Sequence, residues 1–322
     1  MLQTRITDLL GIRYPITQGG LAHLAFAGLA AAVSEAGGLG QVTATTLPSV
    51  DALREEIRTV RLLTAQPFGV NFQIGRRDLS ELVLAAAEEG TPVMSFTAGD
   101  PAGYYKLIEG MGIKKLALVA SVRQAQHAEA LGADAIIAVG FEGGGHIGRD
   151  DIGTIVLVPR IAESVGIPVL ASGGLADGRG LVAALALGAA GVEMGTRFIA
   201  TQECIAHINY KQALVDAQET DTIVVERSIE RPARVLRTPL AEAILEIEKG
   251  GASIEDLLPM VSGEMNLLAA HQGDMEGGFV WAGQVVGLIK DIPSVRELIE
   301  RTMQDAESIL KQLCSDIKPS GG

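Results

Sequence analysis

The sequence predicts an α/β fold, a (β/α)8 TIM barrel with an inserted C-terminal helical cap. Through roughly the first 200 residues, helix-like stretches that end at glycine alternate with short apolar runs, about eight times in all. The short runs are apolar on both faces, which is typical of strands buried in a parallel sheet. The 39 glycines are spaced along the chain, which suits tight turns and argues against disorder. A doubly wound sheet is the alternative, but it usually has fewer strands and a different glycine placement at its first turn.

The predicted strands and helices follow one another in regular order. The strands are expected at 14–18, 39–42, 68–71, 92–96, 115–119, 135–139, 168–172 and 191–194. The helices between them are expected at 25–36, 50–63, 79–89, 104–109, 122–131, 155–165 and 180–187. Each helix pattern except that of 50–63 stops at a glycine, where a left-handed residue commonly ends a helix.

The pattern changes after Arg197. Residues from about 205 to 275 carry charge-rich helical patterns, at 240–249 and 254–260, with no further alternation of strand and helix. We therefore expect three parts: a TIM barrel over 1–207, a helical substrate cap over 208–270, and a return segment over 271–322 that completes the barrel. The tail through Leu313 predicts a long closing helix.

Composition and charge exclude several classes of function. Lys and Arg number 26 against 39 Asp and Glu, a net charge of −13 that disfavours general nucleic-acid binding. It leaves phosphorylated ligands possible, because backbone N–H groups bind phosphate without a cation. No apolar run of about 18 residues predicts a membrane span, and no signal peptide is visible, so we expect a cytoplasmic protein. The sequence leaves open whether the chain forms a homodimer.

Glycine-rich turns follow the last two predicted strands. They comprise Ser172, Gly173 and Gly174 after one strand, and Gly195 and Thr196 after the next. Barrels commonly bind a phosphate at this place, and glycine leaves the backbone open to the anion. The alternative is that the glycines only make a tight turn.

His146 lies in a third glycine-rich segment, Gly140 to Gly148, after the sixth strand. Histidine is the common general acid or base near neutral pH, although this one could also hydrogen-bond only a loop carbonyl. His23, His207 and His271 are weaker candidates, and the two cysteines suggest neither a disulfide framework nor a nucleophile. The sequence has no His, Cys or acidic residues at metal-binding spacing, so we expect no metal site. It has no G-x-S-x-G elbow, which disfavours a hydrolase, and no ordered G-x-G-x-x-G after a first strand, which disfavours a Rossmann site.

The chain resembles the nitronate monooxygenase (2-nitropropane dioxygenase) family, which is related to flavin-dependent enoyl-ACP reductase II and to NAD(P)H:quinone reductases. The stretches that carry the resemblance are TRITDLLGIRYPITQGG, PFGVNF, GADAIIAVGFEGGGHIG, SGGLADGRG, MGTRF and AGQVVGLI. They span nearly the whole chain.

The resemblance implies FMN bound without a covalent link. Gly20, Leu21 and Ala22 would run along the isoalloxazine ring, with Asn71 facing it and Gln73 nearby. Ser172, Gly173 and Gly174, with Gly195 and Thr196, would hold the phosphate. Gly144 would lie against the flavin, and His146 would be the catalytic histidine. The chain departs from its relatives at Val139, Leu118 and Glu193, where other side chains are common.

Three functions follow as hypotheses. The first is an FMN-dependent monooxygenase that oxidises alkyl nitronates with O2. The second uses NAD(P)H to reduce FMN and then a quinone or an enoyl thioester. The third is a non-redox lyase or isomerase on the same barrel. In each case the partner is a small-molecule substrate.

Overall fold

The computed structural model describes residues 2–75, 77–261 and 263–316, and eight parallel strands form its central sheet. The strands are β1 (Ile16–Gln18), β2 (Gly40–Thr43), β3 (Phe68–Gln73), β4 (Val93–Thr97), β5 (Lys114–Val119), β6 (Ala135–Val139), β8 (Val169–Ser172) and β9 (Gly191–Met194). Their order is β1-β9-β8-β6-β5-β4-β3-β2, and a parallel bridge between Thr17 and Leu39 joins the two ends. The predicted TIM barrel and all eight of its strands are confirmed.

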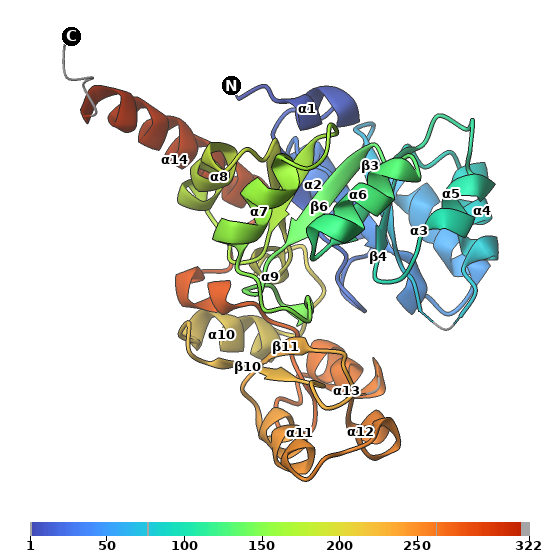
Figure 1. The fold of residues 1–322 in the computed structure, drawn as a ribbon, viewed down its shortest axis with the longest axis vertical. Helices are drawn as coiled ribbons and strands as arrows, with labels where there is room; N and C mark the ends of the chain where they lie inside the picture. Colours follow the sequence, from blue (N-terminus) through green and yellow to red (C-terminus); the bar gives the residue numbers. More distant parts are fainter. Residues whose placement is uncertain (1, 76, 262, 317–322) are drawn as a thin grey trace.

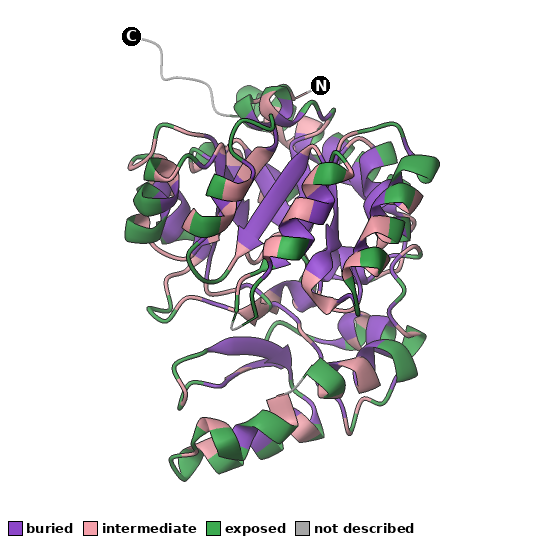
Figure 2. Ribbon diagram, turned by 90° about the vertical axis from the view of Figure 1, so that its right-hand side faces the viewer, coloured by how far each residue is buried: buried purple, intermediate pink, exposed green. Residues whose placement is uncertain are grey.

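Helices surround this barrel (Figure 1). They are α2 (Ala27–Glu35), α3 (Val50–Leu63), α4 (Ser80–Glu88), α5 (Ala102–Leu107), α6 (Val122–Ala130), α7 (Thr154–Ala162), α8 (Gly178–Ala186) and the short α9 (Thr196–Ile199). In α3 the buried residues are Leu53, Ile57 and Val60, the spacing of one helix face. The strands are buried, while the outer faces of the helices are exposed (Figure 2).

One end of the barrel is closed by α1 (Arg5–Leu10). Ile6 and Leu10 of this helix share a buried cluster with apolar residues of four strands, namely Val93, Leu116, Ile137 and Leu170. In Figure 1, α1 and the cap lie at opposite ends of the molecule. Since α1 fills the amino-terminal ends of the strands, a ligand site is expected at their carboxyl ends, as in other barrels of this type.

The cap contains both helices and strands. Its elements are α10 (Ile208–Asp216), β10 (Thr222–Val225), β11 (Ala233–Leu236), α11 (Pro239–Lys249), α12 (Ile254–Val261), α13 (Gly263–Leu267) and a π-helical turn, η2 (Leu268–Gln272). The antiparallel sheet β10-β11-β7 includes β7 (Gly145–His146), which comes from a barrel loop. The helices of the expected cap are present, and the cap also contains strands that were not expected, because four-residue strands paired with a distant loop leave little local signal.

The return segment leads back to the barrel. A 3-10 turn, η3 (Gln284–Leu288), precedes the long helix α14 (Val295–Asp316), which packs on α8 and α2. The approach to α8 is close: a Cβ at Gly178 would lie 2.5 Å from the Ala306 nitrogen. The predicted closing helix is confirmed, whereas the boundaries of the three expected parts stay predictions. Residues 317–322 of the expected return segment lie outside the described residues.

Among the described residues, no helix is long and apolar enough to cross a membrane.

Candidate active site

A cavity of about 670 Å³ lies where the carboxyl ends of the strands meet the cap and the return segment. Its walls include all twelve residues for which the sequence predicted a role: Gly20, Leu21, Ala22, Asn71, Gln73, Gly144, His146, Ser172, Gly173, Gly174, Gly195 and Thr196. The cap and return segment add Tyr210, Trp281 and Gly283. The fold thus brings the predicted residues to one place, while their individual roles stay predictions.

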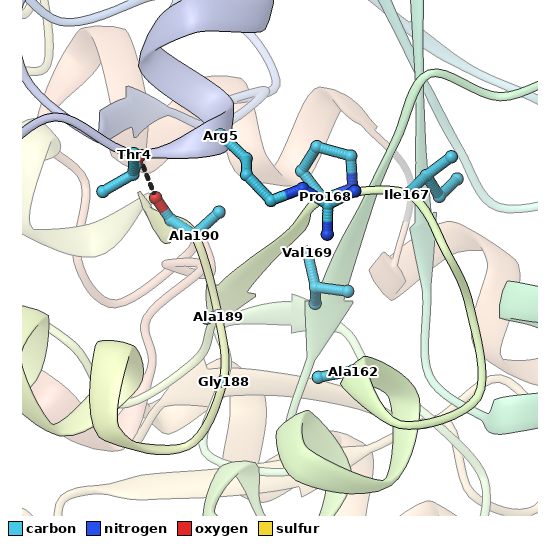
Figure 3. Close-up of a pocket in the computed structure, with 9 residues that line it drawn as sticks. All are labelled: Thr4, Arg5, Ala162, Ile167, Pro168, Val169, Gly188, Ala189 and Ala190. Atoms are coloured by element: carbon cyan, nitrogen blue, oxygen red, sulfur yellow. Dashed lines mark hydrogen bonds between the residues drawn. The ribbon is translucent and has the colours of Figure 1, made fainter.

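A second, smaller cavity of about 210 Å³ lies at the α1 end (Figure 3). Its lining is made of backbone and small apolar side chains around Arg5, which donates a hydrogen bond to the Gly166 carbonyl, and Thr4, which donates to the Ala190 carbonyl at 2.6 Å. This is the amino-terminal face of the barrel, which serves stability in this fold. The larger cavity is therefore the candidate active site.

The segment that holds Gly20 to Ala22 is fixed by short contacts to neighbouring strands. The Leu21 N–H donates to Thr43 Oγ1 at 2.9 Å. At Gly20 there is no room for a side chain, because a Cβ would lie 2.2 Å from Asn71 Oδ1. Asn71 is itself oriented by its amide, which donates to Ser95 Oγ at 2.9 Å.

A buried polar chain continues from Asn71 across the inside of the barrel. Ser95 Oγ donates to Gln41 Oε1 at 2.6 Å, and Gln41 Nε2 donates to Glu193 Oε2 at 3.3 Å. Glu193 lines the cavity and is only 4% exposed. Burial raises the pKa of its carboxyl to about 7, because the charged form loses its hydration. Gln41 and Ser95 were missed, although polar residues inside apolar strands are a visible signal.

The glycine-rich turns pack backbone against backbone. Gly173 and Gly174 have φ values of +97° and +73°, the left-handed region that favours glycine. A Cβ at Gly173 would lie 3.0 Å from the Gly140 carbonyl oxygen, and one at Gly144 would lie 2.6 Å from the Gly283 nitrogen. Part of the glycine requirement is therefore structural, so the tight-turn interpretation stays open beside the phosphate interpretation.

His146 lies on β7, opposite Ala233 of β11. Its Nε2 is 3.3 Å from Arg231 Nη2 and 3.8 Å from Glu226 Oε2. The Trp281 ring lies against the imidazole, with 5.4 Å between ring centroids. Glu226 was missed from the sequence, and Arg231 and Trp281 were not connected with the histidine, because these residues lie 80 or more positions away along the chain.

The histidines that the sequence made weaker candidates, His23, His207 and His271, do not line the cavity. His271 Nε2 donates to the His23 carbonyl at 2.7 Å, and His207 Nδ1 accepts from the Asn209 N–H at 3.1 Å, where it caps α10. Burial raises the pKa of the Cys204 thiol to about 11, which disfavours the thiolate that a nucleophile needs. Within residues 2–75, 77–261 and 263–316, no three His, Cys, Asp or Glu side chains are grouped to hold a metal ion.

Comparison with known proteins places the chain in a family. A model of the family described as nitronate monooxygenase matches residues 3–305. The chain belongs to the nitronate monooxygenase family. It is therefore an enzyme, an oxidoreductase, and the resemblance inferred from its motifs is confirmed.

Two relatives and a solved structure are similar over nearly the whole chain. A probable nitronate monooxygenase of Staphylococcus saprophyticus is 33% identical, over 97% of this chain and 99% of that protein. The (3aS,4S,5R,7aS)-5-hydroxy-7a-methyl-1-oxo-octahydro-1H-indene-4-carboxyl-CoA dehydrogenase of Mycobacterium tuberculosis is 35% identical, over 95% of this chain and 96% of that protein. The structure of FabK from Thermotoga maritima has a TM-score of 0.92 and 43% identity, and it covers 98% of this chain and 100% of that one.

Proposed function

We propose that the protein is an FMN-dependent monooxygenase that oxidises alkyl nitronates with O2. The observation that carries the proposal is the cavity itself. It joins the glycine-rich ends of β8 and β9, the Gly20 segment and a single imidazole, that of His146, in one wall. The family, and a relative named as a probable nitronate monooxygenase, support this choice of substrate.

The residues present fit FMN in size and chemistry. The cavity of about 670 Å³ is within the usual range of cofactor sites. Gly20, Gly144 and Gly173 line the cavity and carry no side chain, so their backbone is open to a planar ring or a phosphate. Ser172, Gly173, Gly174, Gly195 and Thr196 would hold the phosphate, and Gly20, Leu21, Ala22, Asn71, Gln73 and Gly144 would surround the ring. When bound, FMN would supply the electron transfer to and from substrate.

The protein side chains then bind and orient the substrate. His146 would position the anionic nitro group of a nitronate. With a neutral nitroalkane it would remove the proton from the carbon beside the nitro group, so that the electron pair of the C–H bond enters the nitro group. Trp281, packed against the imidazole, would keep water from that face of the histidine.

Anaerobic mixing tests the proposal. FMN-loaded protein is mixed without oxygen with the nitronate of 2-nitropropane while the flavin absorbance is followed. We expect bleaching, and recovery of the colour when O2 is admitted. In the His146→Asn protein, we expect turnover of the neutral nitroalkane to fall about 10²-fold or more. Full turnover in that variant would contradict the role of His146, and absence of bleaching by the nitronate would contradict the substrate.

A second candidate function has an observation of its own. Arg123 lines the same cavity and offers its guanidinium group to the phosphates of an acyl-CoA, while Arg149, which also lines it, pairs with Glu230 at 3.2 Å. The relative from M. tuberculosis is named as a dehydrogenase of a carboxyl-CoA. In this case NAD(P)H would be the co-substrate, and a thioester or a quinone would accept the electrons. Bleaching by NADH or NADPH, but not by the nitronate, would favour this function.

The structure weakens one version of that candidate. Four arginines that lie close together in the sequence, Arg227, Arg231, Arg234 and Arg237, would form a basic patch for an acidic carrier protein if their charges were free. Arg227 instead pairs with Asp151 at 3.1 Å, and Arg237 pairs with Glu242 at 3.0 Å. Arg234 is buried and donates to the Phe141 carbonyl at 2.9 Å. These contacts leave little free positive charge for a carrier protein.

A further inference from the structure

Glu226 is a buried carboxylate beside the candidate catalytic histidine. It follows β10 in the cap, its side chain is 2% exposed, and its Oε2 has no hydrogen-bond partner. This oxygen lies 3.8 Å from His146 Nε2 and 3.8 Å from Arg231 Nε. A buried carboxylate oxygen without a partner is costly, so a fold retains it where another group can satisfy it.

The backbone holds Glu226 in this place against its own preference. Its φ is +62°, the left-handed region that residues other than glycine seldom adopt. Two hydrogen bonds stabilise this backbone conformation. The Glu226 N–H donates to Glu248 Oε2 at 3.0 Å, and the Arg231 N–H donates to the Glu226 carbonyl at 3.0 Å. Backbone strain of this kind clusters at active sites and ligand-binding segments.

The two charged side chains that face His146 make opposite demands on its Nε2. Arg231 only donates, so its contact requires the lone pair on Nε2 and the proton on Nδ1. Glu226 only accepts when it is ionised, so it requires the proton on Nε2. Ala233 on β11 and Trp281 of the return segment also lie beside His146, and neither carries a charge.

Burial decides between these two demands. The Arg231 side chain is 47% exposed and finds hydrogen-bond partners in water, whereas Glu226 at 2% exposure does not. Loss of the hydrogen bond between Arg231 and His146 Nε2 therefore costs little free energy, whereas a Glu226 carboxylate left without a hydrogen bond costs much more. The oxygen and Nε2 reach hydrogen-bond distance when 3.8 Å shortens by about 1 Å, and such contacts commonly tighten when substrate binds.

We propose that Glu226 is a positioning residue that fixes the Nε2–H tautomer of His146 and leaves Nδ1 as the base. In the proton transfer, the C–H bond of a neutral nitroalkane breaks, an N–H bond forms at Nδ1, and the electron pair enters the nitro group. The imidazolium that results is stabilised by the adjacent carboxylate. Arg231, released from Nε2 while its Nε stays beside Glu226, can then donate from Nη2 to an anionic part of the substrate.

This inference rests on the proposed function for its kinetics, but the tautomer is measured without turnover. The experiment is ¹⁵N NMR of histidine in the wild-type chain and in Glu226→Gln, with the His146 signal assigned from His146→Asn. We expect the Nε2–H form to dominate in the wild type. In Glu226→Gln the side-chain amide and Arg231 can both donate to Nε2, so we expect the Nδ1–H form to gain at its expense. Glu230→Gln is the matched control, because Glu230 lies in the same turn, is exposed and pairs with Arg149 at 3.2 Å; it should keep the wild-type tautomer.

The kinetic arm separates proton removal from the later chemistry. In Glu226→Gln we expect kcat/KM for the neutral nitroalkane to fall about 10-fold, part of what a positioned base contributes. With the preformed nitronate, which needs no proton removal, we expect a change within about 3-fold, since general-base assistance is not used. A dominant Nδ1–H form in the wild type, or the same tautomer in wild type and Glu226→Gln, would overturn the inference. Failure of both proteins to use any nitro compound, with the tautomers as expected, would overturn the proposed function only.

Discussion

At the scale of single residues, Glu193 is the clearest case of a side chain whose surroundings set its chemistry. It is buried in the cavity wall, its carboxylate accepts a hydrogen bond from Gln41 Nε2 at 3.3 Å, and burial raises its pKa to about 7. The native state therefore keeps this proton at a pH where the unfolded chain has lost it. Stability from Glu193 is then largest in acid and is lost as the pH rises from about 4.5 to about 7.

Substitution of Glu193 by glutamine should remove this pH dependence. We expect the free energy of unfolding of the wild type to fall by up to roughly 3 kcal/mol, relative to Glu193→Gln, between pH 4.5 and pH 8. The measurement is urea unfolding of the FMN-free proteins across this range. Glu55→Gln, at an exposed position of α3, is the control and should follow the wild type. Parallel curves for the wild type and Glu193→Gln would show that Glu193 titrates alike in both states.

The residues at the strand ends could be predicted from the sequence, but the side chains that contact them from the cap could not. His146 and the glycines were predicted because each follows an apolar strand, which is a local signal. Glu226, which we propose as the positioning group, lies 80 residues further on in a charge-rich stretch. Only the pairing of β7 with β11 brings that stretch to the histidine.

At the scale of elements, the cap has a small core of its own. Ile223 and Val225 of β10, Val235 of β11, Ile244 of α11 and Leu257 of α12 form one buried cluster with Phe279. The cluster also contacts Trp281, which is the single tryptophan of the chain and reports on the cap by its fluorescence.

Truncation of Leu257 should loosen this core. Leu257 is fully buried, so Leu257→Ala removes packed methyl groups and should destabilise the cap by about 2–5 kcal/mol. The neighbouring Leu258 is 55% exposed, and Leu258→Ala should change stability by less than about 0.5 kcal/mol. Urea unfolding followed by Trp281 fluorescence measures both. Equal midpoints for the two variants would mean that the cluster does not hold the cap together.

The barrel elements were predictable from local sequence, and the cap strands were not. Each barrel strand is a short apolar run bounded by glycine or proline, so its pattern is complete within about ten residues. β10 and β11 are four residues each, and β7, the partner of β11, is a two-residue strand from a loop between β6 and α7. Tertiary pairing of this kind carries no periodic signal.

At the scale of the whole molecule, the chain combines a closed end and an open end. α1 fills the amino-terminal end of the barrel, while cap and return segment frame the cavity at the other end. The FMN site is the central claim that depends on this arrangement. It also depends on close approaches such as that of Gly20 to Asn71, where a Cβ would lie 2.2 Å from Oδ1.

Titration of FMN into the FMN-free protein tests this claim most directly, with quenching of Trp281 fluorescence and the visible flavin spectrum as readouts. We expect a single FMN per chain, and binding at least about 10-fold weaker in Gly20→Ala, because the added methyl group displaces Asn71. Gly28→Ala is the control, since a Cβ there meets nothing within 4 Å, and it should bind FMN as the wild type does. A wild-type chain that takes up no FMN, or a Gly20→Ala protein that binds it equally well, would contradict the site described above.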